Sequence, residues 1–476
     1  MQALDRFEAA LIGAGVAPHR EQGRRVAAAV GTVAILEGPA PATATLADLL
    51  ARRLPGAPRL RRRAVPVPLG LGPPVWADDP RFDVAAHLRR AAVPGPGGPS
   101  QLAGLVSELT DRPFPAGRPP WELCLVEGVA GGRWALVSRA HVALVDGRRA
   151  HDPLVILAGD HPAADAGEPP RWVPEPEPSG IDLVAMALAS RLFDPLLAVR
   201  LGAQAAFAPY RGLARLTGVA MERALRWSFG GPAVPRPPAA PGSGRAWRSA
   251  EVDLGLLRRV GASHGAAVHD VVLTLVAAGV RRLLRSAGEP VAGRVARALV
   301  PVSVGRAGMP AGRGPGVEPA WINLPVGLAD PSEALEAVSA QTAPLRHSGR
   351  ARRGAELANV DGFAAPDLVV AGLRIAPTRS PGSAFGPRLD AVVINAPGPQ
   401  QAMYVGERRV VAAWPVVPVT GQLGLGLAAY SYSGTVYLGV SADGDAERAA
   451  AVVAGVEEAA AHLARGLAPG RAPGGL

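Results

Sequence analysis

The residues best suited to chemistry in this sequence are His141, Asp146 and Gly147, which stand at the spacing H-x-x-x-x-D-G. They close the stretch 133–147, RWALVSRAHVALVDG, whose apolar run predicts a strand buried on both faces and whose end predicts a turn. Glycine lets the chain turn sharply, so the short polar side chains beside it point beyond the sheet. A positioned imidazole that takes a proton from a hydroxyl typically contributes about 10²–10⁴ in rate. We therefore expect chemistry at the end of this strand.

This spacing resembles the active-site motif H-H-x-x-x-D-G of the bacterial wax ester synthase/diacylglycerol acyltransferase (WS/DGAT) family, within the CoA-dependent acyltransferase superfamily. Aligned on Asp146 and Gly147, the first family histidine is His141, and the second, the family's general base, is replaced by Val142. The resemblance implies that Asp146 is a buried structural anchor paired to an arginine, and that Gly147 permits the turn. The motif therefore indicates the family and leaves the activity open.

Further blocks resemble the same family and keep its order along the chain. PVWADDPRFDVAAHLRR resembles P-x-W-x-x-D-x-x-F-D-L-x-x-H-V-R-R, and GRPPWELCLVEG resembles R-P-L-W-E at Trp121, a side chain that needs a large apolar slot. In the second half, the family's Asn-Asp pair appears as His269-Asp270, and DAVVINAPGP resembles N-V-P-G-P at Asn395. The candidates for substrate binding are Val142, Trp121, Asp270 and Asn395.

His269 is a further catalytic candidate, beside His141, Asp146 and Gly147. A base lost at Val142 in one half coincides with an imidazole gained at His269 in the other. A histidine at the start of a helix is more often a capping or packing residue. The replacement-base hypothesis therefore requires the His269 ring to face the space beside Val142.

The elements that must position these residues alternate between strands and helices. Apolar periodicity predicts strands at 30–38 and 121–128 and helices at 45–54, 100–114 and 263–284. The resemblance implies an α/β fold of two similar chloramphenicol-acetyltransferase-like halves, each a mixed sheet with flanking helices, with the reaction tunnel between them.

The resemblance and the Pro-rich stretches together suggest three parts of the chain. Residues 1–160 form an N-terminal acyltransferase-like domain that carries the degenerate motif. Residues 161–245 hold Pro-rich linkers and an amphipathic helical segment, and residues 246–476 form a C-terminal acyltransferase-like domain. Within the middle part, the apolar faces with several arginines over 181–230 are the best candidate for a peripheral contact with an anionic membrane or a lipid droplet, although apolar stripes are more often core. The alternative is a helical pair packed between the halves.

The amino-acid composition indicates which kinds of binding partner and which cellular compartment to expect. The 476 residues are 48% hydrophobic and carry a formal net charge of +10, supplied by arginine alone because the sequence has no lysine. We see no nucleic-acid-binding motif, and the single cysteine, Cys124, excludes a disulfide framework or thiolate metal cluster. With no signal peptide or stretch of about 20 apolar residues, we expect a cytoplasmic protein, peripheral at most on the inner face of the plasma membrane.

The family's activity implies an acyl-CoA co-substrate, a hydroxyl acceptor such as an alcohol or diacylglycerol, and no metal or bound cofactor. Three functions stay open because Val142 replaces the base. The first is an O-acyltransferase with a relocated base or substrate assistance. The second is a degenerate homologue that binds acyl chains, lipid or a protein partner, and the third is acyl transfer to a specialised natural-product acceptor.

Overall fold

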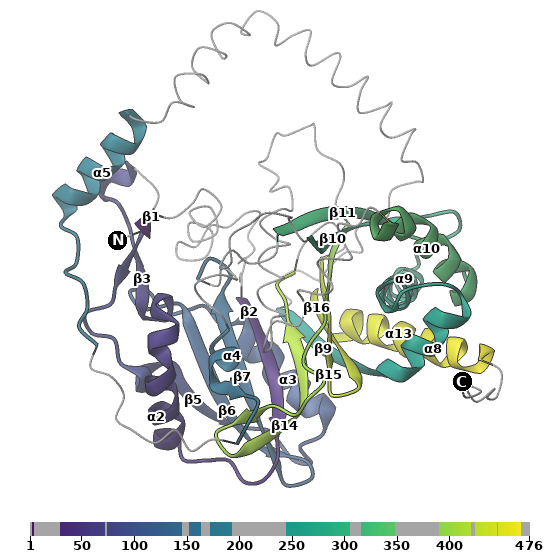
Figure 1. The fold of residues 1–476 in the computed structure, drawn as a ribbon, viewed down its shortest axis with the longest axis horizontal. Helices are drawn as coiled ribbons and strands as arrows, with labels where there is room; N and C mark the ends of the chain where they lie inside the picture. The colour runs from purple at the N-terminus through teal and green to yellow at the C-terminus, as the bar shows by residue number, and fades with distance from the viewer. Residues whose placement is uncertain are drawn as a thin grey trace, which may run out of the picture.

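The structure, a computed structural model, describes residues 2–3, 29–71, 74–144, 152–162, 172–192, 244–304, 316–347, 390–419, 424–444 and 446–467. Strands and helices alternate along most of this part of the chain (Figure 1). The described strands form a sheet of seven, a sheet of six and a small sheet of three. The expected mixed α/β fold class with two main sheets is therefore confirmed.

The first main sheet has the strand order β5-β6-β7-β2-β14-β13-β8, in which β5 and β6 are parallel and the other neighbours antiparallel. Its strands are β2 (Ala29–Leu36), β5 (Leu88–Ala92), β6 (Trp121–Val129), β7 (Arg133–His141), β8 (Ala158–Gly159), β13 (Tyr404–Val405) and β14 (Arg408–Val416). The helices around it are α2 (Thr43–Arg53), α3 (Pro99–Asp111) and α4 (Pro153–Leu157), with the short 3₁₀ turns η1 (Leu54–Gly56), η2 (Pro58–Arg61) and η4 (Val84–His87).

A small outer sheet adjoins this half. It consists of β1 (Gln2–Ala3), β4 (Val75–Asp78) and β3 (Arg62–Val65). The turn η3 (Pro68–Gly70) lies between β3 and β4 along the chain. Helix α5 (Gly180–Leu192) packs Leu183 and Ala187 against Val65, Val67 and Val75. This packing fixes α5 at the outer end of the first half, at the left of Figure 1.

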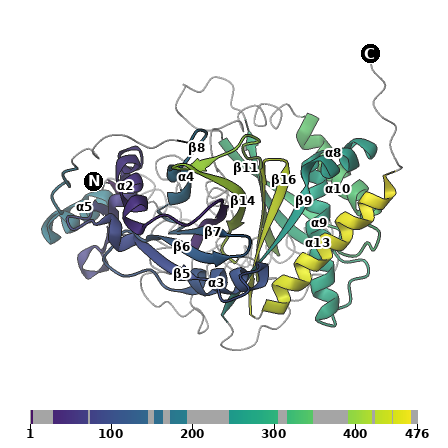
Figure 2. The ribbon, with the colours of Figure 1, turned by 90° about the horizontal axis from the view of Figure 1, so that it is seen from below.

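The second main sheet has the order β11-β10-β12-β15-β16-β9, with parallel pairs only at β10-β12 and β12-β15. Its strands are β9 (Arg245–Asp253), β10 (Ala296–Val304), β11 (Gly316–Leu324), β12 (Ala391–Ala396), β15 (Leu425–Tyr432) and β16 (Thr435–Asp443). Its helices are α8 (Leu254–Ser263), α9 (Val268–Ser286), α10 (Pro331–His347) and α13 (Ala446–Gly466). Seen from below, α8, α9, α10 and α13 lie together on the outer side of this sheet (Figure 2). None of the described helices is long and apolar enough to span a bilayer.

The two faces of the second sheet belong to different cores. In β12, Ala391 and Val393 pack with the helices of the second half, whereas Val392 and Ile394 join the core of the first half. Successive residues of a strand point to opposite faces, so β12 separates the two cores. The inner face of the second sheet is therefore packed against the first half.

Strands β13 and β14 cross from the second half of the chain into the first sheet, where β14 pairs with β2. The crossing is close, because a Cβ added at Gly439 of β16 would overlap the carbonyl oxygen of Pro415 in β14. The indole N–H of Trp247 donates to the same oxygen at 3.2 Å. The sequence boundaries assigned 246–476 wholly to the second half and did not foresee this exchange.

Several sequence-derived predictions fall on positions that the structure does not describe. The residues 193–243, which carry most of the expected amphipathic segment, and 145–151, which carry Asp146 and Gly147, lie outside the described part. The prediction of an arginine partner for Asp146 therefore stays a prediction.

Candidate active site

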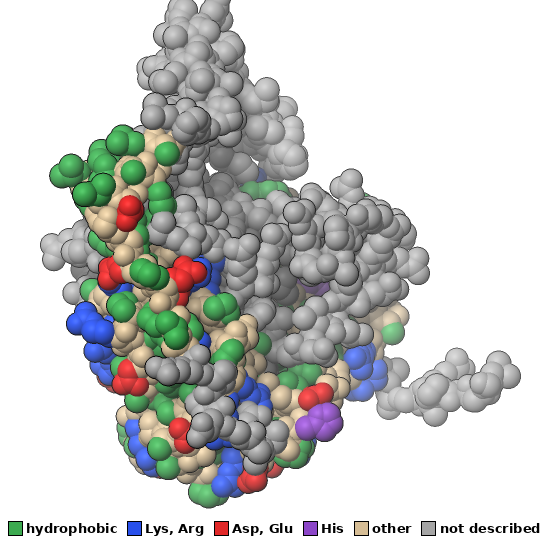
Figure 3. Space-filling model, turned by 60° about the vertical axis from the view of Figure 1, so that its left-hand side comes forward, with side chains coloured by type: hydrophobic (Ala, Val, Ile, Leu, Met, Phe, Trp, Pro, Cys, Tyr) green, Lys and Arg blue, Asp and Glu red, His purple; other side chains and the backbone are tan. Residues whose placement is uncertain are grey.

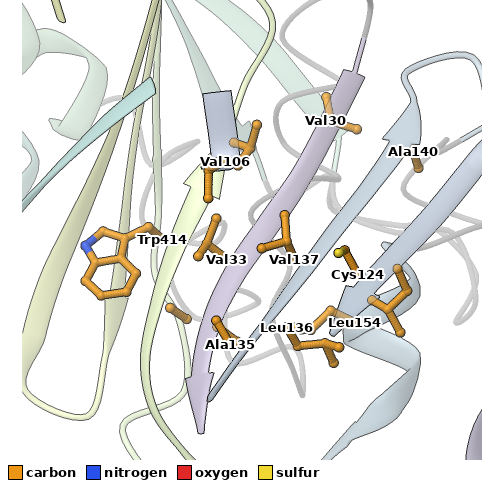
Figure 4. Close-up of a cluster of buried hydrophobic side chains, with 14 of the residues drawn as sticks. Val30, Val33, Val106, Cys124, Ala135, Leu136, Val137, Ala140, Leu154 and Trp414 are labelled. Carbon is orange, nitrogen blue, oxygen red and sulfur yellow. The ribbon is translucent and has the colours of Figure 1, made fainter. Parts of the chain in front are cut away.

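The end of β7 places His141 at the edge of a buried layer. The backbone N–H of His141 donates to the carbonyl oxygen of Pro120 at 2.8 Å, and Ala29 of β2 lies opposite. Around β7 the core consists of apolar side chains, with Val33 of β2 beside Val137 (Figure 4). Alternation along β7 puts His141 on the same face as Arg139 and Val137. The rigid core thus fixes the direction of the histidine.

The His141 imidazole is enclosed and neutral. Its side chain is only 3% exposed, and burial lowers its pKa to about 4. Nδ1 accepts a hydrogen bond from the backbone N–H of Ala143 at 3.2 Å, and Nε2 has no hydrogen-bond partner among the described residues. The ring of Phe114 meets the imidazole edge-on at 6.0 Å between centroids. At neutral pH the side chain therefore carries a single proton.

Val142, the residue that the motif resemblance aligns with the family's base, lies in a fully enclosed apolar turn. Val142, Ala143 and Leu144 have no exposed surface. The N–H of Leu144 donates to the His141 carbonyl oxygen at 2.8 Å, and the Arg59 guanidinium donates to the Ala143 carbonyl oxygen at 3.0 Å. The turn is thus held by its backbone, and position 142 offers no group that can take a proton.

A buried ion pair lies beside the histidine. The Arg139 guanidinium donates to the Glu122 carboxylate at 2.6 and 2.8 Å, and the two side chains are 4% and 7% exposed. Arg139 also donates to the carbonyl oxygens of Arg112 and Pro113, and it lies 4.5 Å from the ring centroid of Phe114. The pair therefore fixes the segment whose phenyl ring contacts His141.

Arg139 and Phe114 were not among the site residues predicted from the sequence. The sequence did hold one signal for Arg139, which is a charged residue in the middle of an apolar strand. An arginine in such a place needs a buried partner, so its position could have indicated an ion pair. Glu122 stood in the W-E block, but only the pairing of β6 with β7 brings it opposite Arg139.

Trp121 lies in a stack of rings away from solvent. It is 1% exposed, and its indole N–H donates to the Leu60 carbonyl oxygen at 2.7 Å. The His87 ring stacks on it at 4.2 Å between centroids, and Nδ1 of His87 lies 2.9 Å from the Trp121 carbonyl oxygen. Burial lowers the pKa of His87. The indole N–H of Trp121 is therefore already hydrogen-bonded within the protein.

The second-half candidates meet at the start of α9. His269 Nδ1 lies 3.0 Å from the Asn395 side-chain nitrogen, near the end of β12. Asn395 shares the face of Val393, which packs with the helices of the second half. Asp270 is fully buried, accepts from the backbone N–H of Ala267 at 2.9 Å and accepts from the Thr342 hydroxyl at 2.6 Å. Asp270 therefore caps α9 and ties it to α10, while His269 and Asn395 form a polar pair on the helix-covered face.

The fold as a whole is shared with solved acyltransferase-like structures. The wax ester synthase/diacylglycerol acyltransferase from Marinobacter aquaeolei VT8 superposes with a TM-score of 0.61 at 20% identity, covering 98% of this chain and 99% of that one. The first condensation domain of the calcium-dependent antibiotic synthetase superposes with a TM-score of 0.52 at 17% identity, covering 97% and 96%. The two-sheet architecture is thus of the chloramphenicol-acetyltransferase-like class.

Sequence comparison narrows this class to one family. The wax ester synthase/diacylglycerol acyltransferase catalytic domain matches residues 21–272, and the WS/DGAT C-terminal domain matches residues 317–463. The chain belongs to the WS/DGAT family. A relative in Mycobacterium tuberculosis H37Rv, named "Probable diacyglycerol O-acyltransferase tgs1", is 29% identical over 470 residues, covering 95% of this chain and 94% of its own. Rv3087 of the same organism is 32% identical over 395 residues, 82% of each chain.

Proposed function

We propose that the protein is an acyl-CoA-dependent O-acyltransferase of the WS/DGAT type, which transfers a fatty acyl group from CoA to an alcohol or diacylglycerol. The observation that carries the proposal is the match of both WS/DGAT domains within one chain, over 21–272 and 317–463. Acyl-CoA is then a co-substrate, and the reaction needs no metal or bound cofactor.

Val142 sets the expected rate. An alcohol is a poor nucleophile at neutral pH, and loss of a general base typically costs about 10²–10⁴ in rate. The enclosed apolar turn at Val142 therefore supports slow transfer to ordinary alcohols. The same observation favours one second candidate, a homologue that binds acyl chains without turnover.

Release of CoA from palmitoyl-CoA separates these functions. We would measure the free thiol with hexadecanol, dioleoylglycerol or no acceptor, and identify the ester product by mass spectrometry. The protein adds little background, because its only cysteine, Cys124, is buried and burial raises its thiol pKa to about 11. Acceptor-dependent release with ester formation supports the acyltransferase. Saturable acyl-CoA binding with no ester from the wild type or from Val142→His contradicts it and supports the binding protein.

A lipid surface is the proposed source of the acceptor. Three exposed apolar side chains lie on α5 and on the turn η3, which contacts it: Leu69 is 91% exposed, Ile181 82% and Leu188 47%. We call these three side chains the apolar crest. Figure 3 shows hydrophobic side chains gathered at the upper left of this face of the molecule. Long-chain alcohols and diacylglycerol reside in lipid, so a crest that enters the interface brings the protein to its acceptor.

Sedimentation with vesicles tests the crest. Vesicles of phosphatidylglycerol and phosphatidylethanolamine with dioleoylglycerol should pellet the wild type, and the double substitution Leu69→Ser with Ile181→Ser should reduce the pelleted fraction severalfold. Leu328→Ser, which changes a partly exposed leucine of the second half, is the matched control. Equal loss with the control substitution, or no loss with the double substitution, would contradict the crest.

A further inference from the structure

The Nε2 atom of His141 is a buried polar atom that the described fold leaves without a partner. Most buried polar side-chain atoms in proteins have at least one hydrogen-bond partner, and an exception calls for a specific explanation. His141 lies at the end of β7 and immediately precedes the position of the family's base. The unpaired nitrogen is therefore in the region where the reaction must occur under the proposed function.

The hydrogen bond to Ala143 determines which nitrogen carries the proton. A backbone N–H can only donate, so Nδ1 of His141 must offer its lone pair in the 3.2 Å contact. A neutral imidazole has one proton, which is then on Nε2. Protonation of Nδ1 would break the contact with Ala143, and burial already disfavours the imidazolium, with a pKa of about 4. Nε2 is thus a hydrogen-bond donor and has no lone pair with which to act as a base.

We infer that His141 donates its Nε2–H to the carbonyl oxygen of the acyl thioester and stabilises the negative charge that develops there. This inference rests on the proposed acyltransferase function. The acceptor oxygen bonds to the carbonyl carbon and the carbon–sulfur bond of acyl-CoA breaks. The hydroxyl proton passes to solvent, the CoA thiolate regains a proton from solvent, and His141 keeps its proton throughout. Donors aimed at such an oxyanion typically contribute about 10²–10³ in kcat.

The surroundings of His141 suit a fixed donor. The strand pairing holds the backbone of His141, the Ala143 N–H holds Nδ1, and the Phe114 ring, which Arg139 contacts, lies edge-on to the imidazole. Phe114 itself is only partly buried. A preorganised donor in a water-excluded place acts without reorganisation during the reaction.

The infrared carbonyl band of bound [1-¹³C]palmitoyl-CoA tests the inference on the full chain. A hydrogen bond to the thioester oxygen lowers the stretching frequency. We expect a downshifted band with the wild type and with His141→Gln, whose side-chain amide can donate from a position close to Nε2. With His141→Phe the band should return to the frequency of a thioester without a hydrogen bond.

The outcomes separate the inference from the proposed function. Binding of acyl-CoA to the wild type without a downshift overturns the inference alone. Failure of the wild type to bind acyl-CoA overturns the acyltransferase function and the inference with it.

A second measurement, by ¹⁵N NMR, tests the inference even if the His141→Phe variant does not fold. The ¹⁵N spectrum of histidine-labelled protein, assigned by the signal lost in His141→Gln, should show a bare Nδ1 and a protonated Nε2 at pH 7. A protonated Nδ1 on His141 would overturn the inference.

Discussion

Arg139 and Glu122 form an ion pair of 2.6 Å between the neighbouring strands β7 and β6, and both side chains are buried. Through the same guanidinium the pair reaches the carbonyl oxygens of residues 112 and 113 and the ring of Phe114. His141 stands two residues further along β7. The contact between these strands therefore organises the segment beside the imidazole as well as the sheet.

Arg139→Ala should lower the free energy of unfolding by about 3–5 kcal/mol, because it leaves the Glu122 carboxylate buried without its main partner. Urea unfolding followed by circular dichroism measures the change. Arg90→Ala is the control, since Arg90 pairs with Glu127 on the same sheet but both side chains are largely exposed. Equal urea midpoints for the two variants would show that the buried ion pair contributes no more to stability than the exposed one.

Much of the scaffold around this pair was predictable from the sequence. The strand expected at 30–38 is β2, and the helix expected at 100–114 corresponds to α3, because apolar periodicity is a local signal. The helical pattern at 263–284 contains the start of α9, but the chain turns at Gly265, whose φ is +63°, and the helix begins only at Val268. Local pattern does not show a boundary that a left-handed residue imposes.

The features of the site that were not predictable from the sequence depend on backbone geometry that only the folded chain shows. Glu122 meets Arg139 only through strand register, and the tautomer of His141 depends on the backbone of the turn that follows. The exchange of β14 pairs residues nearly four hundred positions apart in sequence, such as Leu36 and Val410. The hydrophobic pattern of β2 or of β14 does not indicate which strand it pairs with.

Val142→His should raise CoA release with hexadecanol at least tenfold and up to about 10⁴-fold, because it restores an imidazole at the position of the family's base. Val142→Gln is the control, since it adds bulk and polarity to the same enclosed turn without a base of suitable pKa. A gain in both variants would point to loosening of the turn, and a gain in neither would contradict the assignment of the missing base to position 142.

The wild type should also discriminate strongly between acceptors by acidity. Without a protein base, the fraction of ionised acceptor limits the attack, and a phenolic hydroxyl with a pKa of about 10 ionises far more readily than an alkanol. Product formation with a long-chain alkylphenol should therefore exceed that with hexadecanol by tenfold or more. In Val142→His this ratio should fall, and a ratio that stays constant between the two proteins would argue against the explanation.

His141 should make the fold sensitive to acid. Burial lowers its folded-state pKa to about 4, whereas in the unfolded chain the value is about 6.5. Below pH 6.5 the unfolded state takes up a proton that the folded state does not, so stability falls as the pH drops from 6.5 to 4 and is unaffected above that range. The contribution is about 2 kcal/mol between pH 7 and pH 5.

His87 responds in the same direction, because burial lowers its pKa as well. The measurement is therefore the difference between the wild type and His141→Gln in urea unfolding at pH 7 and pH 5. The variant should lose less stability on acidification. Parallel losses in the two proteins would mean that His141 titrates normally in the folded state.

Gly439→Ala should destabilise the protein by more than 2 kcal/mol, because the added Cβ overlaps the Pro415 carbonyl oxygen where β14 crosses β16. Gly104→Ala is the matched control. Gly104 lies inside α3 with open space around it, so alanine there should stabilise the helix by about 0.5–1 kcal/mol. Thermal unfolding gives both changes, and a neutral Gly439→Ala would refute the close crossing.

The exchanged strand β14 also has a consequence for biosynthesis. On the ribosome, β2 emerges long before its neighbour β14, which is complete only at Val416. Until then the nascent first half presents one side of β2 as an open edge with unpaired N–H and C=O groups, which is a template for pairing with other chains. Premature termination before residue 416 therefore yields a chain prone to aggregation, and the two halves expressed separately should gain solubility only when they are produced together.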